Sequence, residues 1–474
     1  MSIYIMNKLV TPEGTKITLL KEIEDAKTKG MLHILYMKYL SSFSYSSNML
    51  IPYYDDYNDE IRDLIVINNP DDAERITFNH VKKTPYLKNV VYDSIISTTD
   101  TNHWKEQRQS YKDAFSVDTE LKELIPIINK RAQISVKLLQ DSQKICDEEY
   151  VNIYDFFLNE TMAQLQLAMF GFSNEYQEKS NKKIREAFRD MNAIKGRSFV
   201  HSLLNETKTA KGPLSKTMKE RNKETDNKRE EFGNALIFPF AGHDTTANTL
   251  TWLIYELSIN NDARIKLQAE VDQFWHEHPD ENNIVYDDLK KLKYMTRCIM
   301  EILRLWTAIP NGTFRELDKD DYIMGKDGAN VEIPTGTYVQ IPNWTRHRNP
   351  ELWGKDVNCF NPDRDFRDEE FYFGKGIASY NPASERFSPF TYGPRDCIGK
   401  NFSQIEMRII LLHILKRFHF SLTVMQKIAH SVNEADIGFN SFTLGPRNMY
   451  NSKLTDNKLG LFVDVYKRET RSKL

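Results

Sequence analysis

The chain has 474 residues, with 64 lysines and arginines against 67 aspartates and glutamates, and its formal net charge is −3. This balance excludes the strongly basic surface typical of nucleic-acid binding, and the length suffices for one large domain. The four cysteines, Cys146, Cys298, Cys359 and Cys397, form no C-x-x-C pair, which excludes a zinc ribbon, argues against a disulfide scaffold and favours a reducing compartment.

The first 50 residues show no pattern of a signal peptide or membrane anchor. They contain no apolar run near the ~18 residues that a membrane-spanning helix needs. Met31–Leu40 is the most apolar stretch, and His33 and Lys38 within it favour a short buried helix. We therefore expect no transmembrane anchor in segment 1–50, and a location in the cytoplasm or at the periphery of a membrane.

Short strand and helix patterns alternate in the next part of the chain. Leu64–Ile67 is a compact strand candidate. A helix is predicted over Asn69–Ile76, because Pro70 suits a first helical turn and acidic residues follow it. Residues 104–175 predict helices with apolar stripes, and residues 176–230 predict polar, solvated helices.

The second half of the chain continues the helical pattern. Residues 232–310 predict long helices, residues 331–339 predict a hairpin with alternating apolar residues, and Gly460–Val465 predicts a last strand. The fold class predicted for residues 1–474 is therefore mainly α, with a small β-rich lobe, in a single domain.

The most informative pattern is F-x-x-G-x-R-x-C-x-G, formed by Phe390, Gly393, Arg395, Cys397 and Gly399. An amphipathic helix pattern follows at once, so the thiol should lie at a helix N-terminus, where the dipole lowers a thiol pKa. A thiolate on a tight turn is a good ligand for a redox-active metal. The two glycines would let the backbone turn and approach a flat cofactor, the phenylalanine would keep water from the sulfur, and the arginine would pair with an acidic cofactor edge. The alternative is a structural cysteine in a helix-capping loop.

A second motif interrupts an apolar helical run. Its members are Ala241, Gly242, Asp244 and Thr245, and a proline stands just upstream. Glycine, aspartate and threonine are poor helix formers, and broken local rules often mark functional sites. A kink or π-bulge would open a groove here, the two small residues would admit a planar ring and a diatomic ligand, and the acid and hydroxyl would relay protons. The alternative is a kinked core helix.

Both patterns resemble the signature motifs of the cytochrome P450 (haem-thiolate) superfamily, and the resemblance runs from about Leu64 to the end of the chain. It implies that Cys397 ligates the iron of haem b (iron protoporphyrin IX), and that Asp244 and Thr245 serve oxygen activation. His243 is expected to pack rather than to bind metal.

Further motifs fit the same resemblance. The helix pair Trp104 and Arg108 resembles the W-x-x-x-R motif that binds one haem propionate, and Arg315 resembles the arginine that reaches the other. The E-x-x-R pair at Glu301 should be buried and should need a further partner to satisfy its hydrogen bonds. In the resemblance that partner is Arg364, with a structural role.

The implied reaction is monooxygenation, in which one atom of dioxygen enters an apolar organic substrate and the other leaves as water. No flavin or iron–sulfur motif is present, so electrons should come from a separate flavin reductase or ferredoxin. Lys400, Arg408, Lys416 and Arg417 are a hypothetical basic docking face for that donor. The alternatives are a haem-thiolate isomerase or dehydratase, which tends to lose the acid–threonine pair, and a non-catalytic haem-binding protein.

Overall fold

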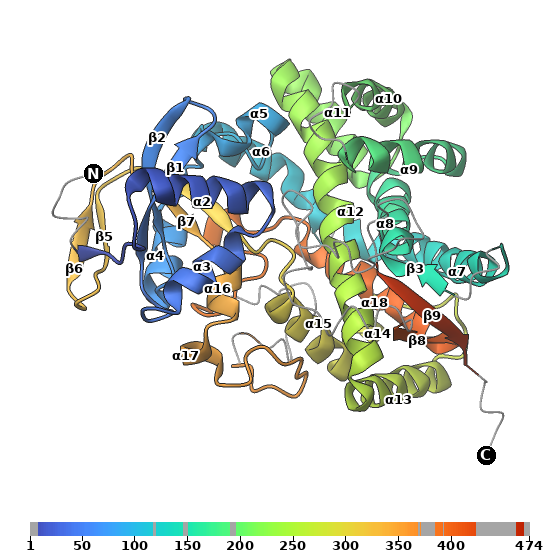
Figure 1. Cartoon of the computed structure of the whole chain (residues 1–474). Coiled ribbons are helices and arrows are strands. Elements are labelled where there is room, and N and C mark those ends of the chain that lie inside the picture. The colour runs from blue at the N-terminus through green and yellow to red at the C-terminus, as the bar shows by residue number, and fades with distance from the viewer. Residues whose placement is uncertain are drawn as a thin grey trace.

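The computed structural model describes residues 8–116, 120–145, 150–189, 196–367, 370, 384–391, 393–422 and 461–468. Figure 1 shows a β-rich lobe, which holds the first strands, beside a larger body of helices. This arrangement confirms the predicted fold class, mainly α with a small β-rich lobe. The assignment of residues 1–474 to one domain stays a prediction.

The β-rich lobe is built on a four-stranded sheet with the order β1-β2-β7-β4. These strands are β1 (Met49–Asp55), β2 (Glu60–Val66), β7 (Tyr338–Ile341) and β4 (Thr313–Glu316). β2 pairs antiparallel with β1 and parallel with β7, so segments far apart in the sequence share one sheet. The helices α2 (Lys16–Thr28) and α3 (Leu32–Leu40) pack their apolar residues on β1 and β2. The predicted buried helix is confirmed to within a residue, and the predicted strand Leu64–Ile67 is confirmed as part of β2, which begins four residues earlier.

The predicted hairpin over residues 331–339 is wrong. β6 (Asn330–Ile333) pairs with β5 (Asp321–Met324) in a separate two-stranded sheet, whereas β7 joins the main sheet. Between β6 and β7 the chain passes Pro334, which has no N–H to donate, and Gly336, whose φ of +80° favours glycine. The alternating pattern identified the strands but not their partners.

The helix predicted after Asn69 is confirmed as α4 (Pro70–Asn79). The Asn69 side chain caps it by accepting the N–H of Asp72 at 3.1 Å, and Pro70 stands in its first turn. The shorter helices and turns are η1 (Pro85–Leu87), α5 (Lys88–Val91), η2 (Asp113–Phe115), α14 (Tyr286–Leu289), α16 (Asn343–His347), α17 (Pro350–Trp353) and η6 (Gly393–Arg395).

The helical body surrounds one long helix, α12 (Lys228–Ile259), which Figure 1 shows crossing the middle of the molecule. The other long helices are α6 (Thr101–Lys112), α7 (Lys122–Ile145), α8 (Ile153–Gln164), α9 (Asn174–Arg189), α10 (Gly196–Thr209), α11 (Pro213–Thr225), α13 (Asn261–Glu277), α15 (Lys293–Leu305) and α18 (Lys400–Arg417). A π-helical turn, η4 (Leu165–Phe170), continues α8, and a small sheet of order β3-β9-β8 joins β3 (Tyr150–Asn152), β9 (Phe462–Lys467) and β8 (Phe418–Leu422).

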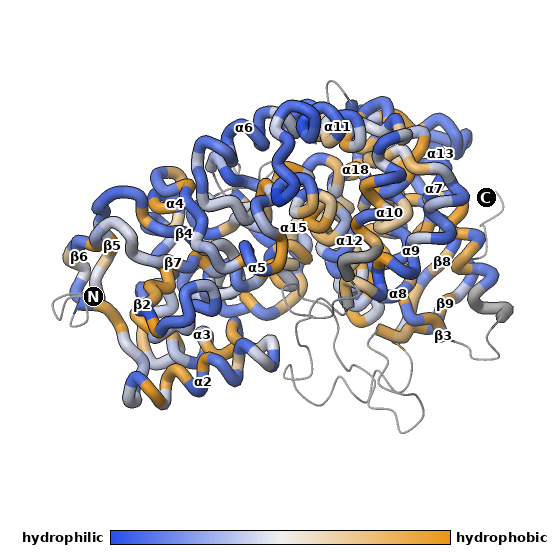
Figure 2. Tube along the Cα trace, turned by 90° about the horizontal axis from the view of Figure 1, so that it is seen from above, coloured by the Kyte–Doolittle hydropathy of each residue, from blue (hydrophilic) through white to orange (hydrophobic). Residues whose placement is uncertain are grey.

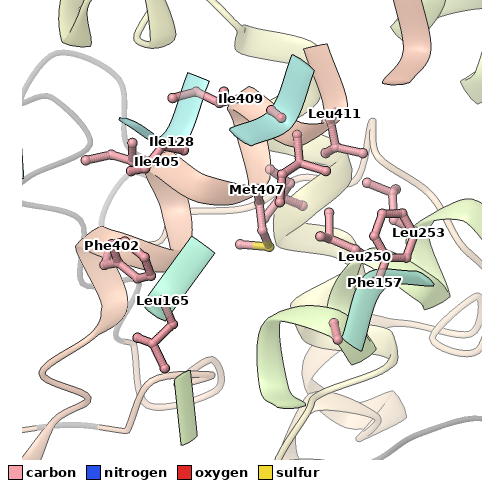
Figure 3. Packing of buried hydrophobic residues seen from close by; sticks show 14 of the residues in the cluster. Ile128, Phe157, Leu165, Leu250, Leu253, Phe402, Ile405, Met407, Ile409 and Leu411 are labelled. Carbon is pink, nitrogen blue, oxygen red and sulfur yellow. The ribbon is translucent and has the colours of Figure 1, made fainter. Parts of the chain in front are cut away.

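The main core lies where α18, α12 and α8 meet. Figure 3 shows Met407 and Leu411 of α18 facing Leu250 and Leu253 of α12 and Phe157 of α8. All five side chains are at most 1% exposed. Burial of such side chains contributes about 1.5–3 kcal/mol each, so this core holds α18, and the loop before it, firmly against the rest of the body.

The polar helices predicted over residues 176–230 are also present. Figure 2 shows α11 and much of α9 as mostly hydrophilic along the outside of the helical body. Within the part of the chain that the structure describes, we found no helix with both the length and the apolar character needed to cross a membrane.

A buried ion network joins α15 to the segment that follows α17. Arg304 binds both carboxylate oxygens of Glu301, at 2.8 and 2.7 Å, and both side chains are 0% exposed. Arg364 adds a contact to Glu301 Oε1 at 3.1 Å. The remaining guanidinium hydrogens of Arg304 reach the carbonyls of His347 and Val357. The predicted burial of the pair and its completion by Arg364 are confirmed.

Replacement of Glu301 should therefore be strongly destabilising. In Glu301→Gln, Arg304 keeps its charge inside the protein without a counter-charge, and the free energy of unfolding should fall by about 3–5 kcal/mol. The measurement is urea unfolding. The matched control is Asp363→Asn, which removes an exposed ion pair with Lys266 and should cost less than about 1 kcal/mol. Equal losses in the two variants would contradict the structural role of Glu301.

Candidate cofactor and active site

The Cys397 loop is a tight turn that ends directly at the start of α18. The Cys397 N–H donates to the Phe390 carbonyl at 2.9 Å and closes the loop. Gly399 is the residue before the helix, and its N–H hydrogen-bonds the sulfur. The Cys397 side chain is solvent-accessible, and the Phe390 side chain packs on the main core. The predicted position of the cysteine at a helix N-terminus is confirmed.

The prediction that this position lowers the thiol pKa is wrong for the protein alone. Burial among protein atoms raises the pKa of Cys397, and the hydrogen bond from Gly399 offsets only part of that rise. The thiol is accessible to solvent yet deep, so desolvation of the thiolate outweighs the helix N-terminus. A cation at the sulfur would favour the thiolate form.

The two glycines of the loop differ in what they do. Gly393 has a φ of +63°, and a Cβ there would lie 3.1 Å from Phe78 Cδ1, so both conformation and space favour glycine. Gly399 has an ordinary φ of −85°, and a Cβ would make normal contacts with Phe115 and the Cys397 sulfur. The turn thus requires the first glycine but not the second, and the predicted approach of both glycines to a flat cofactor stays a prediction.

Two buried arginines near this loop lack any acidic partner in the described residues. Arg315 is 0% exposed, and its Nε and one terminal nitrogen have no hydrogen bond. Arg395 is 7% exposed, has two nitrogens without partners, and donates once, to the Thr98 carbonyl at 3.0 Å. Its guanidinium lies 4.5 Å from the centre of the Trp104 ring. Burial lowers the pKa of Arg315 to about 9 and that of Arg395 to about 8, so both are cations at neutral pH.

In the motif pair Trp104 and Arg108, the arginine has an acidic partner, unlike Arg315 and Arg395 within the described residues. Arg108 pairs with Asp396, next to the cysteine, through the side chain and through the backbone carbonyl at 2.7 Å. Asp396 also pairs with Lys400. In this structure Arg108 therefore anchors the Cys397 loop, and its predicted contact with a propionate stays a prediction.

The second motif lies in the middle of α12, which is α-helical without interruption from Lys228 to Ile259. The side chains of Ala241 and Thr245 are accessible on one face, and the Thr245 hydroxyl donates to the Ala241 carbonyl at 2.9 Å. Asp244 is 7% exposed and accepts from Asn248 at 3.4 Å. His243 is buried, donates to the Pro239 carbonyl at 2.7 Å and stacks on Phe188, which confirms packing.

Of the predicted kink or π-bulge in α12, the π-bulge is wrong, because α12 is α-helical throughout, whereas its neighbour η4 is a π-helical turn. The predicted reason for a small residue at Gly242 also changes. A Cβ there would lie 2.9 Å from both terminal methyls of Leu165, the first residue of η4. Gly242 therefore permits close packing of α12 on η4, whereas Ala241 is on the accessible face.

A short chain of aromatic contacts links the two motifs. The Phe238 ring of α12 stacks on Phe115 with the centroids 6.0 Å apart. Phe115 in turn lies 3.8 Å from the Cβ position of Gly399, beside the Cys397 sulfur. The accessible thiol and the α12 motif are thus joined through one layer of aromatic side chains.

The hypothetical basic docking face is wrong for Arg408 and stays a prediction for Lys400, Lys416 and Arg417. Arg408 is 2% exposed and binds Gln404 and Thr296 within the core. Lys416 and Arg417 both pair with Glu281, and Lys400 pairs with Asp396. Glu281 thus offsets one of the two charges of Lys416 and Arg417, and Asp396 is shared between Lys400 and Arg108.

Comparison with known proteins identifies the class. The chain matches the sequence profile described as "Cytochrome P450" over residues 59–234 and 214–441. Putative cytochrome P450 CYP13A4 of Caenorhabditis elegans is 34% identical over 220 residues, which are 46% of this chain and 38% of that protein. The 7-deoxyloganic acid hydroxylase of Catharanthus roseus is 34% identical over 195 residues, 41% of this chain and 34% of that protein. These alignments thus cover little more than a third of the relatives' length.

Such a match places the chain in a family of haem-binding oxidoreductases. The chain belongs to the cytochrome P450 family, which implies a haem cofactor, monooxygenase chemistry, a substrate, dioxygen and electron transfer from a redox partner. The residues fit the cofactor: Cys397 is an accessible soft ligand, and the buried guanidinium nitrogens of Arg315 and Arg395 have no anion, whereas haem carries two carboxylates.

The sequence did not predict three residues of this site. Asp396 ties Arg108 to the cysteine loop, and the Thr313 hydroxyl accepts from both Arg315 and Lys83. Nothing in the pair Lys82-Lys83 distinguishes one lysine from the other, since only the fold directs them to different partners. Asp396 stands inside the cysteine motif, and this position in the sequence could have identified it as a residue of the site.

The packing role of Gly242 can be tested by a double-mutant cycle. Gly242→Val should lower the free energy of unfolding by about 2 kcal/mol, because the added methyls meet Leu165. In a Leu165→Ala background the same substitution should cost clearly less, since the contact is gone. Urea unfolding of the single and double variants measures both. Additive losses would show that Gly242 does not act through Leu165.

Proposed function

We propose that this protein is a haem-thiolate monooxygenase that inserts one oxygen atom into an apolar organic substrate. The cofactor would be haem b, and Cys397 would supply the ligand to its iron. The electrons come from a separate flavin reductase or ferredoxin. The balanced reaction takes a C–H bond, one dioxygen, two electrons and two protons, and gives a C–OH group and one water.

One observation carries this proposal. The accessible Cys397 thiol, at the start of α18, stands in the same loop as Arg395, and among the described residues no anion pairs with the buried guanidinium groups of Arg395 and Arg315. A buried unpaired cation is costly, so its presence favours a ligand that brings negative charge. A dicarboxylate macrocycle with a thiolate-bound iron satisfies both requirements at once.

The chain's own residues then have separate tasks. When bound, the haem iron supplies dioxygen activation, and the thiolate ligand favours O–O cleavage. Thr245 presents a hydroxyl on the accessible face of α12, and its oxygen can accept a hydrogen bond while its own proton is held at the Ala241 carbonyl. Asp244, one residue earlier and buried, is the acid that supplies protons to this hydroxyl.

The retained acid–threonine pair favours a monooxygenase over an isomerase or dehydratase. Both side chains lie in an unbroken helix, so their spacing is fixed. An electron-independent reaction has no need of a proton relay at this place. Reductase-dependent oxidation of a bound ligand separates these alternatives, and also separates the enzyme from a non-catalytic haem-binding protein.

The absorption spectrum of the reduced protein under carbon monoxide tests the ligand directly. We expect a strongly red-shifted Soret band, and we expect Cys397→Ser to lose it because the thiolate is gone. Cys359→Ser is the matched control, since Cys359 is exposed and lies in a different segment. A band typical of histidine or neutral-thiol ligation in the wild type, or no haem at all, would overturn the proposal.

Oxygen activation is tested by the yield of product per pair of electrons consumed. Thr245→Ala and Asp244→Asn should each lower this yield roughly tenfold or more, because protons are no longer delivered for oxygen activation. Hydrogen peroxide should be released instead of product. The substrate is the first compound of an apolar panel that shifts the haem spectrum. Thr249→Ala is the control, because that hydroxyl makes the same kind of bond, to the Thr245 carbonyl at 2.9 Å. A yield in Thr245→Ala equal to that of the control would refute the relay.

A further inference from the structure

Three pairs of side chains, spaced one helical turn apart on each helix, join α6 to the first half of α12. The pairs are His103 with Glu230, Gln107 with Asn234, and Tyr111 with Phe238. Their closest contacts are 2.6 Å and 3.0 Å for the two polar pairs and 4.8 Å between the two ring centres. Because α6 also carries Arg108, which anchors the Cys397 loop, this contact connects that loop to α12.

The same contact holds the segment between α5 and α6 in place. The Ile95 N–H donates to Asn234 Oδ1 at 2.9 Å, and Asn234 is 1% exposed. A Cβ at Gly233 would lie 2.5 Å from the Val91 carbonyl oxygen, so α12 lies against this segment without room for a side chain. A change that loosens α6 from α12 should therefore also loosen residues 91–98.

Glu230 is a buried carboxylate that two basic side chains share. It is 1% exposed, and Arg221 of α11 donates to both of its oxygens, at 2.7 and 3.3 Å. Burial raises the pKa of Glu230, but His103 and Arg221 more than offset this effect, so the pKa lies below its ordinary value. Arginine does not lose its proton in proteins, so Arg221 holds Glu230 in position whether or not His103 is charged.

The His103 ring has a different partner for each of its protonation states. When the ring is charged, Nε2 donates to Glu230 at 2.6 Å and Nδ1 donates to the Thr98 hydroxyl at 3.3 Å. The Gln107 amide nitrogen lies 3.2 Å from the same Nε2, and it can donate there only when that nitrogen carries no proton. Loss of the proton thus exchanges a charge-assisted bond to α12 for a neutral bond within α6.

We propose that His103 is a pH-sensitive latch, whose charged ring ties α6 and residues 91–98 to the first turn of α12 and whose neutral ring releases that tie. The latch is independent of the proposed function. The charged groups that act on the ring are Glu230 of α12, Arg221 of α11 and Asp100 of α6.

The sign of the effect follows from these groups. The hydrogen bond with Glu230 raises the pKa of His103 above its ordinary value, and burial offsets only part of that rise. The contribution of the latch to the free energy of unfolding is therefore fully present below the ordinary pKa of histidine, about 6.5. It is lost as the pH rises through the raised pKa of the folded protein.

The test is hydrogen exchange of residues 91–98 in the full-length protein, followed by mass spectrometry from about pH 6 to about pH 9. After correction for the intrinsic exchange rate, protection of this segment should fall about fivefold across that range, because a charge-assisted hydrogen bond is about twice as strong as a neutral one. His103→Gln should show the lower protection at every pH. The matched control is His278→Gln, which removes a histidine–acid pair with Asp288 at 3.0 Å and should keep the wild-type profile.

The proposal is overturned if protection of residues 91–98 stays level in the wild type, or if it falls equally in His103→Gln. If His103→Gln does not fold, the wild-type profile decides: a fall confined to residues 91–98 and α6 supports the latch, and a fall spread over the whole chain refutes it. Urea unfolding is an independent readout, since the free energy of unfolding should decrease with pH more steeply in the wild type than in His103→Gln. Loss of the red-shifted band under carbon monoxide would refute the proposed function and leave these outcomes unchanged.

Discussion

The Glu301 carboxylate is the contact on which the arrangement of the site depends. It holds two arginines and, through them, the backbone carbonyls of residues 347, 357 and 359. That segment then fixes the approach to the cysteine loop, because Arg346 donates to Ser388 Oγ at 2.8 Å and the neutral His347 ring accepts the Ser388 N–H at 3.0 Å. One fully buried acid on α15 thus positions a loop that is nearly a hundred residues further along the chain. Removing it would leave buried arginines without compensation, which is why its influence exceeds that of any surface pair.

A second constraint is the close approach of helices at the centre of the body. α12 packs on η4 through Gly242 with no room for a side-chain carbon, and Thr161 of α8 lies 2.9 Å from the His243 carbonyl. Several carbonyls of this part of α12 accept from side chains in this way. The same helix therefore presents Ala241 and Thr245 on its accessible face while its other side is locked by packing. The motif combines a structural requirement and a chemical one in five consecutive residues.

Periodicity and motif spacing were enough to predict the fold class, the helix after Asn69, the buried Glu301 network and the cysteine at a helix start, since each depends on local chemistry. The errors share a cause, because each depended on long-range geometry. Strand partners in the β-rich lobe are set by the sheet, not by alternation. The thiol pKa depends on how deep the loop lies. Arg408, one of the cations expected on a docking face, is buried, and the others share Glu281 and Asp396, which sequence spacing does not reveal. The cysteine motif could be found from the sequence, whereas Lys83 could not.

Lys83 and Arg315, which both donate to the Thr313 hydroxyl of β4, also bear on how long the protein lasts in a cell. A chain that carries uncompensated charge inside its core has less free energy to lose before it unfolds, and an anionic ligand restores that margin in proportion to its affinity and concentration. Chains made faster than cofactor is supplied would then be the first that proteases remove, because degradation follows the unfolded fraction. On the proposed function, the amount of this protein in a cell would follow the supply of its cofactor.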